Sequence, residues 1–219
     1  MLKNDWAIPV IGLTGSIASG KSVAARFFKR LGAQVVDADR LLRTVTARGR
    51  PAYRKIVAAF GEGILDSRGR IDRAVLGEIV FADGEKRALL ETITHGEIML
   101  AADRRIRRAA GRRFVPLFLE AALLVESGLD RMLDGLVVVA CAPAVQAARL
   151  REMRKMSEEQ IELRLRAQMP PQEKAGAADW VIRNDGTLEA LGARVQKVFR
   201  EIKKSAAYLA KKKTWSAKR

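Results

Sequence analysis

The strongest constraint on the fold of this chain is a glycine-rich loop near its start. The stretch from Gly15 to Ser22 reads Gly-Ser-Ile-Ala-Ser-Gly-Lys-Ser and fits the phosphate-binding pattern G-x-x-x-x-G-K-[S/T] at every fixed position. The apolar run from Val10 to Leu13 precedes the loop and is typical of a buried strand. Apolar residues recur every four positions from Val23 to Leu31 and predict a helix with a broad apolar face. A strand, a glycine loop and a helix in this order predict a P-loop.

The residues of this loop suit the binding of a nucleoside triphosphate. Backbone N–H groups of the loop and of the following helix N-terminus are expected to point at phosphate oxygens, and the helix dipole adds favourable potential. Gly15 and Gly20 allow tight turns and a close approach of the backbone to the ligand. Lys21 is expected to reach the β- and γ-phosphates, and Ser22 is expected to ligate Mg²⁺.

Length and composition fit a folded chain with a hydrophobic core. Its 219 residues suit one α/β domain with an insertion or two small domains, and 48% hydrophobic residues are enough for a sizeable core. Its apolar runs fall short of the ~20 residues of a membrane span, so no membrane partner is expected. Cys141 is the single cysteine, which excludes an internal disulfide and favours a reducing, cytoplasmic location.

The net charge of +16 indicates phosphate-rich partners, either nucleic acid or polyanionic small molecules. Part of this charge is local, because the segment from Lys203 to Arg219 holds seven basic residues and no acidic one. Residues 211–219 are interpreted as a solvated basic tail in preference to a nucleic-acid patch.

Two carboxylates follow the second expected strand, which covers residues 34–36. In an extended Asp37-Ala38-Asp39 segment the two aspartates project to the same side. Ligands of open α/β sheets lie outside the carboxyl ends of the strands, so one aspartate could serve as a metal partner and the other as a general base. Capping of the next helix, over residues 40–45, is an open alternative for either residue.

Residues 40–111 are expected to form a helical insertion. Asp72 is a candidate N-cap for a helix that carries Leu76 and Val80. One further helix is expected around Leu89 and Ile93, and a separate one from Ile98 onwards.

Strands are also expected to end at Glu120, at Cys141 and at Ile182. The carboxylate of Glu120 could act as an outer Mg²⁺ group. Two short arginine-rich helices precede Pro170-Pro171, and Ser157 with Gln160 forms a capping box for the second of them. These helices could be a lid that brings cations over a transferring phosphoryl group, or their arginines could form salt bridges within the helices.

The ordered set of motifs resembles the dephospho-coenzyme A kinase family. The motifs are Asp37-Ala38-Asp39, Arg73-Ala74-Val75-Leu76, Leu90-Glu91 with His95, Leu123-Leu124-Val125-Glu126, Gln146-Ala147-Ala148-Arg149-Leu150, and Ala178-Asp179 with Ile182 and Asn184. The resemblance runs from Pro9 to Val198. Gly96 and Ala122 replace prolines that are usual in the family, and Ser16 and Ala18 replace glycines.

This resemblance implies ATP-dependent phosphorylation of the ribose 3′-hydroxyl of dephospho-CoA, with Mg²⁺, to give coenzyme A and ADP. It implies an α/β fold: a three-layer P-loop NTPase core with a parallel sheet, a helical substrate-binding insertion and a short helical lid. The expected core comprises residues 1–39, 112–149 and 172–210. The CoA domain comprises residues 40–111, the lid residues 150–171 and the basic tail residues 211–219.

The resemblance also assigns site residues. Asp39 is expected to be the general base, with Lys21 as the second catalytic residue and Ser22 as the metal ligand. The expected ATP-binding residues are Gly15, Ala18, Ser19, Gly20, Lys21, Ser22, Val23, Arg149, Arg154 and Asn184. The expected substrate-binding residues are Thr14, Asp39, Arg73, His95, Leu124 and Glu126.

Two other functions fit parts of the sequence. Another small-molecule P-loop kinase, such as a nucleoside monophosphate kinase, shares the loop. An RNA-binding NTPase would account for the positive charge, but aromatic residues make up only 5% of the chain and offer few stacking platforms, so nucleic acid is disfavoured as a partner. No oligomeric state is predicted.

Overall fold

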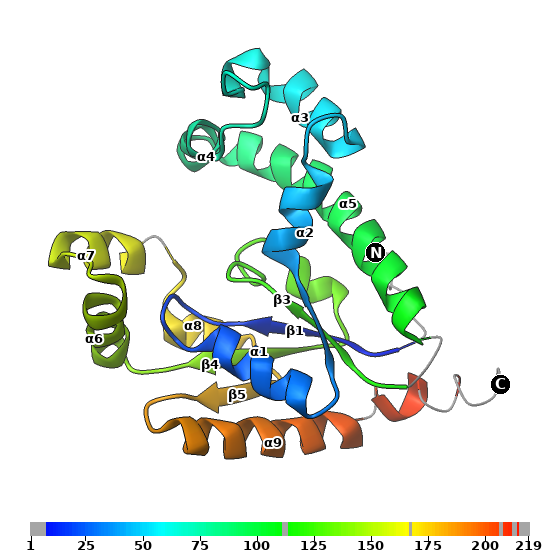
Figure 1. Cartoon of the computed structure of the whole chain (residues 1–219), viewed down its shortest axis with the longest axis vertical. Helices are drawn as coiled ribbons and strands as arrows, with labels where there is room; N and C mark the ends of the chain where they lie inside the picture. Colours follow the sequence, from blue (N-terminus) through cyan, green and yellow to red (C-terminus); the bar gives the residue numbers. More distant parts are fainter. Residues whose placement is uncertain (1–7, 111–113, 167, 206–207, 212–213, 215–219) are drawn as a thin grey trace. The chain divides into compact units, whose positions relative to one another are not determined.

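The computed structural model describes the chain except for residues 1–7, 111–113, 167, 206–207, 212–213 and 215–219. The chain divides into two compact units. The first unit is formed by Met1–Asp37 together with Ile106–Arg219, and the second by Ala38–Arg105. Figure 1 shows the path of the chain through both.

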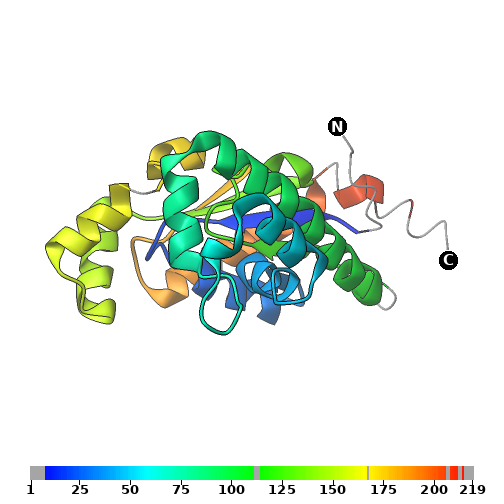
Figure 2. The ribbon, with the colours of Figure 1, turned by 90° about the horizontal axis from the view of Figure 1, so that it is seen from above.

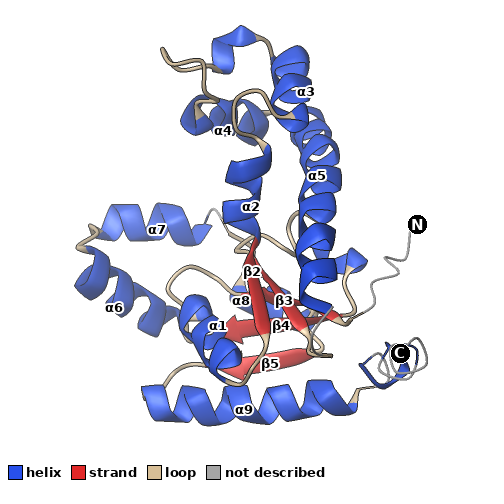
Figure 3. Ribbon diagram, turned by 45° about the vertical axis from the view of Figure 1, so that its right-hand side comes forward, coloured by secondary structure: helices blue, strands red, loops and turns tan. Residues whose placement is uncertain are grey.

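The first unit is built on a parallel sheet with the strand order β2-β3-β1-β4-β5 (Figure 3). The strands are β1 (Val10–Thr14), β2 (Gln34–Asp37), β3 (Leu117–Glu120), β4 (Gly135–Ala140) and β5 (Trp180–Arg183). β3 begins at Leu117, directly after Pro116, which has no N–H to donate to a strand ladder. The parallel sheet between helices confirms the predicted α/β fold class.

One face of the sheet is covered by α1 (Lys21–Arg30) and α9 (Leu188–Lys204), which pack side by side (Figure 1). Side chains alternate along each strand, so Ile11 and Leu13 of β1 join Phe118 of β3 in this layer. The ring of Phe28, from α1, stacks on Phe118 with 4.1 Å between centroids. A buried aromatic contact of this kind holds α1 against the sheet through the later part of the helix.

The opposite face is packed closely at Gly12, where a side chain would require neighbouring leucines to shift. A Cβ at this position would lie 2.8 Å from Cδ1 of Leu136 and 2.9 Å from Cδ1 of Leu133. The segment between β3 and β4 covers this face and contains a short 3₁₀ turn, η2 (Leu129–Met132). Figure 3 shows α8 (Pro171–Gly176) behind the sheet, on the side away from α1 and α9. The first unit therefore has three layers.

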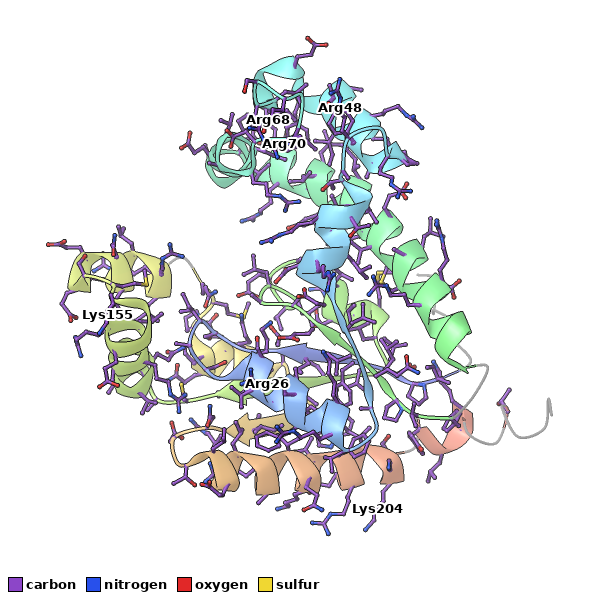
Figure 4. All side chains as sticks on the ribbon, in the orientation of Figure 1. Arg26, Arg48, Arg68, Arg70, Lys155 and Lys204 are labelled. Atoms are coloured by element: carbon purple, nitrogen blue, oxygen red, sulfur yellow. The ribbon has the colours of Figure 1, made fainter. Side chains whose placement is uncertain are left out.

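A helical hairpin follows β4 and consists of α6 (Pro143–Arg154) and α7 (Glu158–Arg166), which Figure 2 shows beside each other. The predicted capping box is confirmed: the Ser157 N–H donates to Gln160 Oε1 at 3.2 Å, and the Gln160 N–H donates to Ser157 Oγ at 3.3 Å. Arg166 pairs with Glu162 within α7 at 2.5 Å, as the salt-bridge alternative expected, and Arg151 pairs with Glu158 between the two helices at 2.5 Å. Lys155, labelled in Figure 4, turns the chain between the helices with φ at +53°.

The second unit is built from helices and loops, as Figure 3 shows. Its elements are α2 (Ala38–Val45), α3 (Pro51–Phe60), η1 (Glu62–Ile64), α4 (Arg73–Ala82) and the first part of α5 (Gly84–Ala110). Ile56, Ile64 and Leu76 form its buried core. The predicted N-cap of α4 is confirmed, because the Asp72 carboxylate accepts from the N–H groups of Ala74 at 2.9 Å and of Val75 at 3.3 Å.

Several arginines of the second unit form contacts with the loop around residues 66–70. Arg48, Arg68 and Arg70 are labelled near one another in Figure 4. The Arg48 guanidinium donates to the carbonyl of Arg68 at 3.3 Å, and Arg70 pairs with Asp66 at 2.7 Å. These arginines are exposed, so each contact contributes little to stability, but together they order the loop.

Contacts between the C-terminal segment and the core extend to Lys211, which lies beyond the expected end of the core at residue 210. The ring of Tyr208, which is buried, lies edge-on to Phe114 with 5.1 Å between centroids. Lys211 was expected in a solvated tail, but its ammonium pairs with Asp134 Oδ2 at 2.8 Å. The same oxygen accepts the N–H of Val10 at 2.8 Å, so Lys211 neutralises a carboxylate that holds the start of β1. Among the described residues, no helix combines the length and apolarity needed to cross a membrane.

The expectation of two helices between Leu89 and Ile106 is wrong, because α5 runs unbroken through both segments. Gly96 lies in the middle of this helix and is exposed. A glycine without a second breaker lowers helix propensity but does not end a helix whose apolar face is packed on both sides of it. Ile93 and Ile98 supply that packing on either side of Gly96.

We expect Gly96→Ala to raise the free energy of unfolding by about 0.5–1 kcal/mol. A Cβ at Gly96 would have no neighbour within 4 Å among the described residues, so the gain in helix propensity has no steric cost. Gly192→Ala in α9 is the matched control, because its Cβ would lie 3.0 Å from Cε1 of Phe27. Thermal unfolding of the three proteins measures the effect, and a lower melting temperature for Gly96→Ala would contradict it.

Candidate active site

The loop between β1 and α1 lines a cavity of about 660 Å³. Gly20 adopts φ +91°, and a Cβ there would lie 2.1 Å from Nδ2 of Asn184. A Cβ at Gly15 would lie 2.4 Å from the carbonyl oxygen of Val139 in β4. Both glycines are therefore required by close approach, and at Gly20 by the left-handed backbone as well.

Ala18 occupies a left-handed position although it carries a side chain, with φ at +58°. This is one of the two positions where the chain departs from glycines usual in the resembling family. A left-handed conformation costs an L-residue about 1–2 kcal/mol, so the contacts of the loop must hold it in place.

The N-terminus of α1 offers positive potential to the cavity. Gly20 is its N-cap, no side chain caps the helix, and its first turn contains no acidic residue. Within the part of the chain that the structure describes, the buried Ser19 Oγ has no hydrogen-bond partner, and Ser19 lines the cavity. An anion in the cavity would meet the helix dipole, loop N–H groups and this hydroxyl together.

Glu120 brings a carboxylate to the Lys21–Ser22 end of the loop. It is the last residue of β3, and its Cα pairs in register with that of Leu13 in β1. Glu120 Oε1 accepts from Lys21 Nζ at 3.1 Å and from Ser22 Oγ at 2.9 Å. The carboxylate and the hydroxyl are hard oxygen donors of the kind that Mg²⁺ takes, usually with few protein ligands. Among the residues that the structure describes, no three or more His, Cys, Asp or Glu side chains are grouped so that they could hold a metal ion.

Two of the predicted ATP-binding side chains reach the loop from distant segments. Arg149, on α6, donates to the carbonyls of Ala18 at 3.2 Å and of Asn184 at 2.9 Å. Asn184, which follows β5, donates from Nδ2 to the carbonyl of Ser19 at 2.7 Å. The side chain of Arg154 lies outside the described residues. The predicted residues that line the cavity are Gly15, Ala18, Ser19, Gly20, Lys21, Ser22, Val23, Arg149 and Asn184.

Three predicted substrate-binding residues lie in the segments next to the loop. Thr14 ends β1, is fully buried, and donates from Oγ1 to the carbonyl of Ala122 at 3.1 Å. Leu124 is fully buried as well. Glu126 forms an ion pair with Lys174 of α8, with 2.6 Å between Oε1 and Nζ. Their substrate-binding roles stay predictions.

Lys174 is a site-forming residue that the sequence did not reveal. It is fully buried, and its ammonium also donates to the carbonyl of Ala122 at 3.0 Å. Ala122 lines the cavity, so the pair fixes a wall of it. A lysine in a short Pro-Gln-Glu-Lys stretch gives no local sign of burial, because its partners are supplied by a segment about fifty residues away.

We expect Lys174→Met to lower the free energy of unfolding by about 3–5 kcal/mol, because it leaves the Glu126 carboxylate without its buried partner. Adding Glu126→Gln removes the uncompensated charge, so the double variant should recover part of the loss. Denaturant unfolding of the wild type, both single variants and the double variant gives the coupling energy. Additive losses would show that the two side chains do not depend on each other.

The expected geometry of the Asp37-Ala38-Asp39 segment is wrong. β2 ends at Asp37 and α2 begins at Ala38, so Asp39 lies in the first turn of a helix. The two-residue alternation of a strand therefore does not extend to Asp39. Strand alternation cannot place the side chains of Asp37 and Asp39 on the same side. Asp37 is the last residue of the first segment of the first unit, and Asp39 belongs to the second unit.

Arg73 and His95, predicted to bind substrate, both belong to the second unit. Arg73 donates to Thr46 Oγ1 at 3.3 Å. Burial and the charge of Arg43 lower the pKa of Arg73, while Asp39 raises it, so Arg43 and Asp39 both lie within electrostatic reach of Arg73. Burial lowers the pKa of His95 and so favours the neutral imidazole, while the charge of Glu91 acts in the opposite direction.

Comparison with known proteins identifies the family. The sequence pattern of dephospho-CoA kinases matches residues 9–190. The chain belongs to the dephospho-CoA kinase family. A dephospho-CoA kinase of Geobacter sulfurreducens is 46% identical over 191 residues, which cover 87% of this chain and 96% of that relative. One of Aquifex aeolicus is 43% identical over 192 residues, with coverage of 88% and 96%.

Solved structures agree with this membership. A crystal structure of a Thermus thermophilus protein has a TM-score of 0.71 at 32% identity and covers 89% of this chain and 97% of its own. The dephospho-CoA kinase of Campylobacter jejuni has a TM-score of 0.60 at 28% identity, with the same coverage. The resemblance inferred from the ordered motifs is thus confirmed, and the RNA-binding NTPase and nucleoside monophosphate kinase alternatives are set aside.

Proposed function

We propose that the chain transfers the γ-phosphoryl group of ATP to the ribose 3′-hydroxyl of dephospho-CoA and so makes coenzyme A and ADP. Family membership over most of the chain supports the acceptor, and the cavity at the P-loop supports the donor. The same proposal makes residues 40–111 the CoA domain and residues 150–171 a lid. It also places the enzyme in the cytoplasm, where its single cysteine would remain reduced.

The cavity is lined by both polar and apolar residues, which suit the phosphates and the base of ATP. Ser19 Oγ, the N-terminus of α1 and Lys21 offer donors and positive charge for the phosphates. Leu188 and Leu191 line the cavity beside Gly186, and we assign this apolar lining to the adenine.

Ser22 and Glu120 are the residues that would hold Mg²⁺ with ATP. The Ser22 hydroxyl would be a direct ligand, and the Glu120 carboxylate would accept hydrogen bonds from the waters of the ion. When bound, Mg²⁺ neutralises negative charge on the phosphate oxygens.

The residues of the chain then act mainly by position and charge. The transferring phosphoryl group spreads negative charge over its equatorial oxygens, and Lys21 lies at the loop end where this charge develops. Glu120 holds the Lys21 ammonium at 3.1 Å, which keeps it directed at this end of the loop. Asp39 is proposed to accept the proton of the ribose hydroxyl, with Arg73 and His95 on the acceptor side.

A coupled assay of ADP production tests the proposed function with dephospho-CoA, AMP, CMP and shikimate as acceptors. We expect turnover with dephospho-CoA to exceed that with each other acceptor by at least about 10²-fold, because the acceptor must be held in line with the γ-phosphoryl group. Mass determination of the product should show one added phosphate and no loss of the original ones. Equal or faster turnover with AMP or CMP would overturn the assignment.

The different roles proposed for Asp39 and Asp37 give a second test. Asp39→Asn keeps the size of the side chain but cannot accept a proton, and loss of a general base lowers turnover by about 10²–10⁴-fold. ATP affinity should stay near that of the wild type. Asp37→Asn, at the end of β2, should instead change the Mg²⁺ dependence or the stability.

Turnover and ATP affinity of both variants across a Mg²⁺ titration separate the two roles. Wild-type turnover in Asp39→Asn, combined with complete loss in Asp37→Asn at every Mg²⁺ concentration, would show that the roles are reversed.

A further inference from the structure

Three successive carbonyl groups of the P-loop each accept a hydrogen bond from a different side chain. The Ile17 carbonyl accepts from Gln146 Nε2 at 2.9 Å, and the Ala18 carbonyl accepts from Arg149 at 3.2 Å. Asn184 Nδ2 donates to the carbonyl of Ser19 at 2.7 Å. The donors come from α6 and from the turn after β5, and more than thirty residues separate Arg149 from Asn184.

These contacts fix the direction of the loop amides as well. A trans peptide unit is planar, and its C=O and N–H point in opposite directions. Holding the Ile17 carbonyl therefore directs the Ala18 N–H to the other side, and holding the Ser19 carbonyl does the same for the Gly20 N–H. Ala18 and Gly20 both line the cavity. The carbonyl contacts thus keep amide donors available to an anion there, while the Ser19 N–H closes a turn onto the Ser16 carbonyl at 3.1 Å.

Gln146 stands out among the three donors because the proposed mechanism gives it no role. Its side chain is 1% exposed, so its amide must be hydrogen-bonded within the protein. The preceding peptide unit is held as well, because the Ile17 N–H donates to Gln168 Oε1 at 2.8 Å. Two glutamines, from the start of the helical hairpin and from the return to α8, therefore hold one residue of the loop.

We propose that Gln146 is a positioning residue of the ATP site, which holds the Ile17 carbonyl and thereby presents the Ala18 N–H to the β-phosphate. Gln146 acts through the loop and does not touch the nucleotide. The Gln146 hydrogen bond fixes the peptide unit between Ile17 and Ala18. It therefore also helps to hold Ala18 in its left-handed conformation. This inference rests on the proposed binding of a nucleotide at the P-loop.

The test compares ADP with AMP, since only ADP carries the β-phosphate that the loop amides would bind. Each is titrated as a competitor of a fluorescent ATP analogue, so that the affinity of this one site is measured. In Gln146→Leu the Ile17 carbonyl loses its donor, and we expect ADP to bind about tenfold more weakly. AMP should bind within about twofold of its wild-type affinity, so the preference for ADP over AMP should fall about fivefold or more.

Two further variants make the result specific. Gln146→Glu keeps the shape but puts an acceptor against the Ile17 carbonyl, so its loss of ADP affinity should equal or exceed that of Gln146→Leu. If Gln146→Leu does not fold, Gln146→Glu decides by the same ratio. Gln196→Leu, an exposed glutamine on α9, is the matched control and should change neither affinity.

A folded Gln146 variant that binds ADP as the wild type does would overturn the inference. Equal weakening of ADP and AMP would also overturn it, because that result indicates general damage to the site. The outcome is independent of the acceptor: a wild-type enzyme that prefers ADP over AMP but does not phosphorylate dephospho-CoA would reject the proposed function and leave this inference standing.

Discussion

The pairing of β1 with β3 on one side and β4 on the other is the constraint on which the site depends. Because the strands are parallel, their carboxyl ends meet at one edge of the sheet. The P-loop leaves β1 there, and Glu120 ends β3 directly beside it. The carbonyl of Val139, in β4, lies so close to Gly15 that only a glycine fits. Strand order therefore decides which side chains can reach the phosphates.

Backbone carbonyls organise the polar interior around this edge. The Ala122 carbonyl accepts from both Thr14 Oγ1 and Lys174 Nζ, and so joins the end of β1, the segment after β3 and α8. A buried ammonium is costly unless it is paired, and Glu126 supplies the pairing charge. The consequence is a rigid wall behind the P-loop, made of segments that are distant in sequence.

Sequence reasoning predicted the features that are set locally. The P-loop, the caps at Asp72 and Ser157 and the apolar strands depend on neighbouring residues, and the structure has them as expected. The break expected near Gly96 is wrong because the packed faces of α5 outweigh one weak helix former. Lys211 departs from a solvated tail because Asp134 pairs with it.

Contacts between distant segments could not be predicted in this way. The separation in sequence from Ile17 is 129 residues for Gln146 and 151 residues for Gln168. A glutamine carries no periodic signal of its own, and its hydrogen-bond partner depends on where helices pack against the sheet. Gln146 belongs to a motif that points to the family, but its partner on the loop can be named only from the fold.

The left-handed backbone at Ala18 shows how these contacts work together. A glycine would adopt φ +58° without steric cost, whereas alanine adopts it at a steric cost that neighbouring interactions must offset. Here the Ile17 carbonyl before Ala18 is held by Gln146, and the Ala18 carbonyl itself is held by Arg149. The same two bonds that offset the strain also orient the amides at the cavity. A chain that lacks the usual glycine at this position therefore depends more strongly on its buried donors to keep the phosphate-binding conformation.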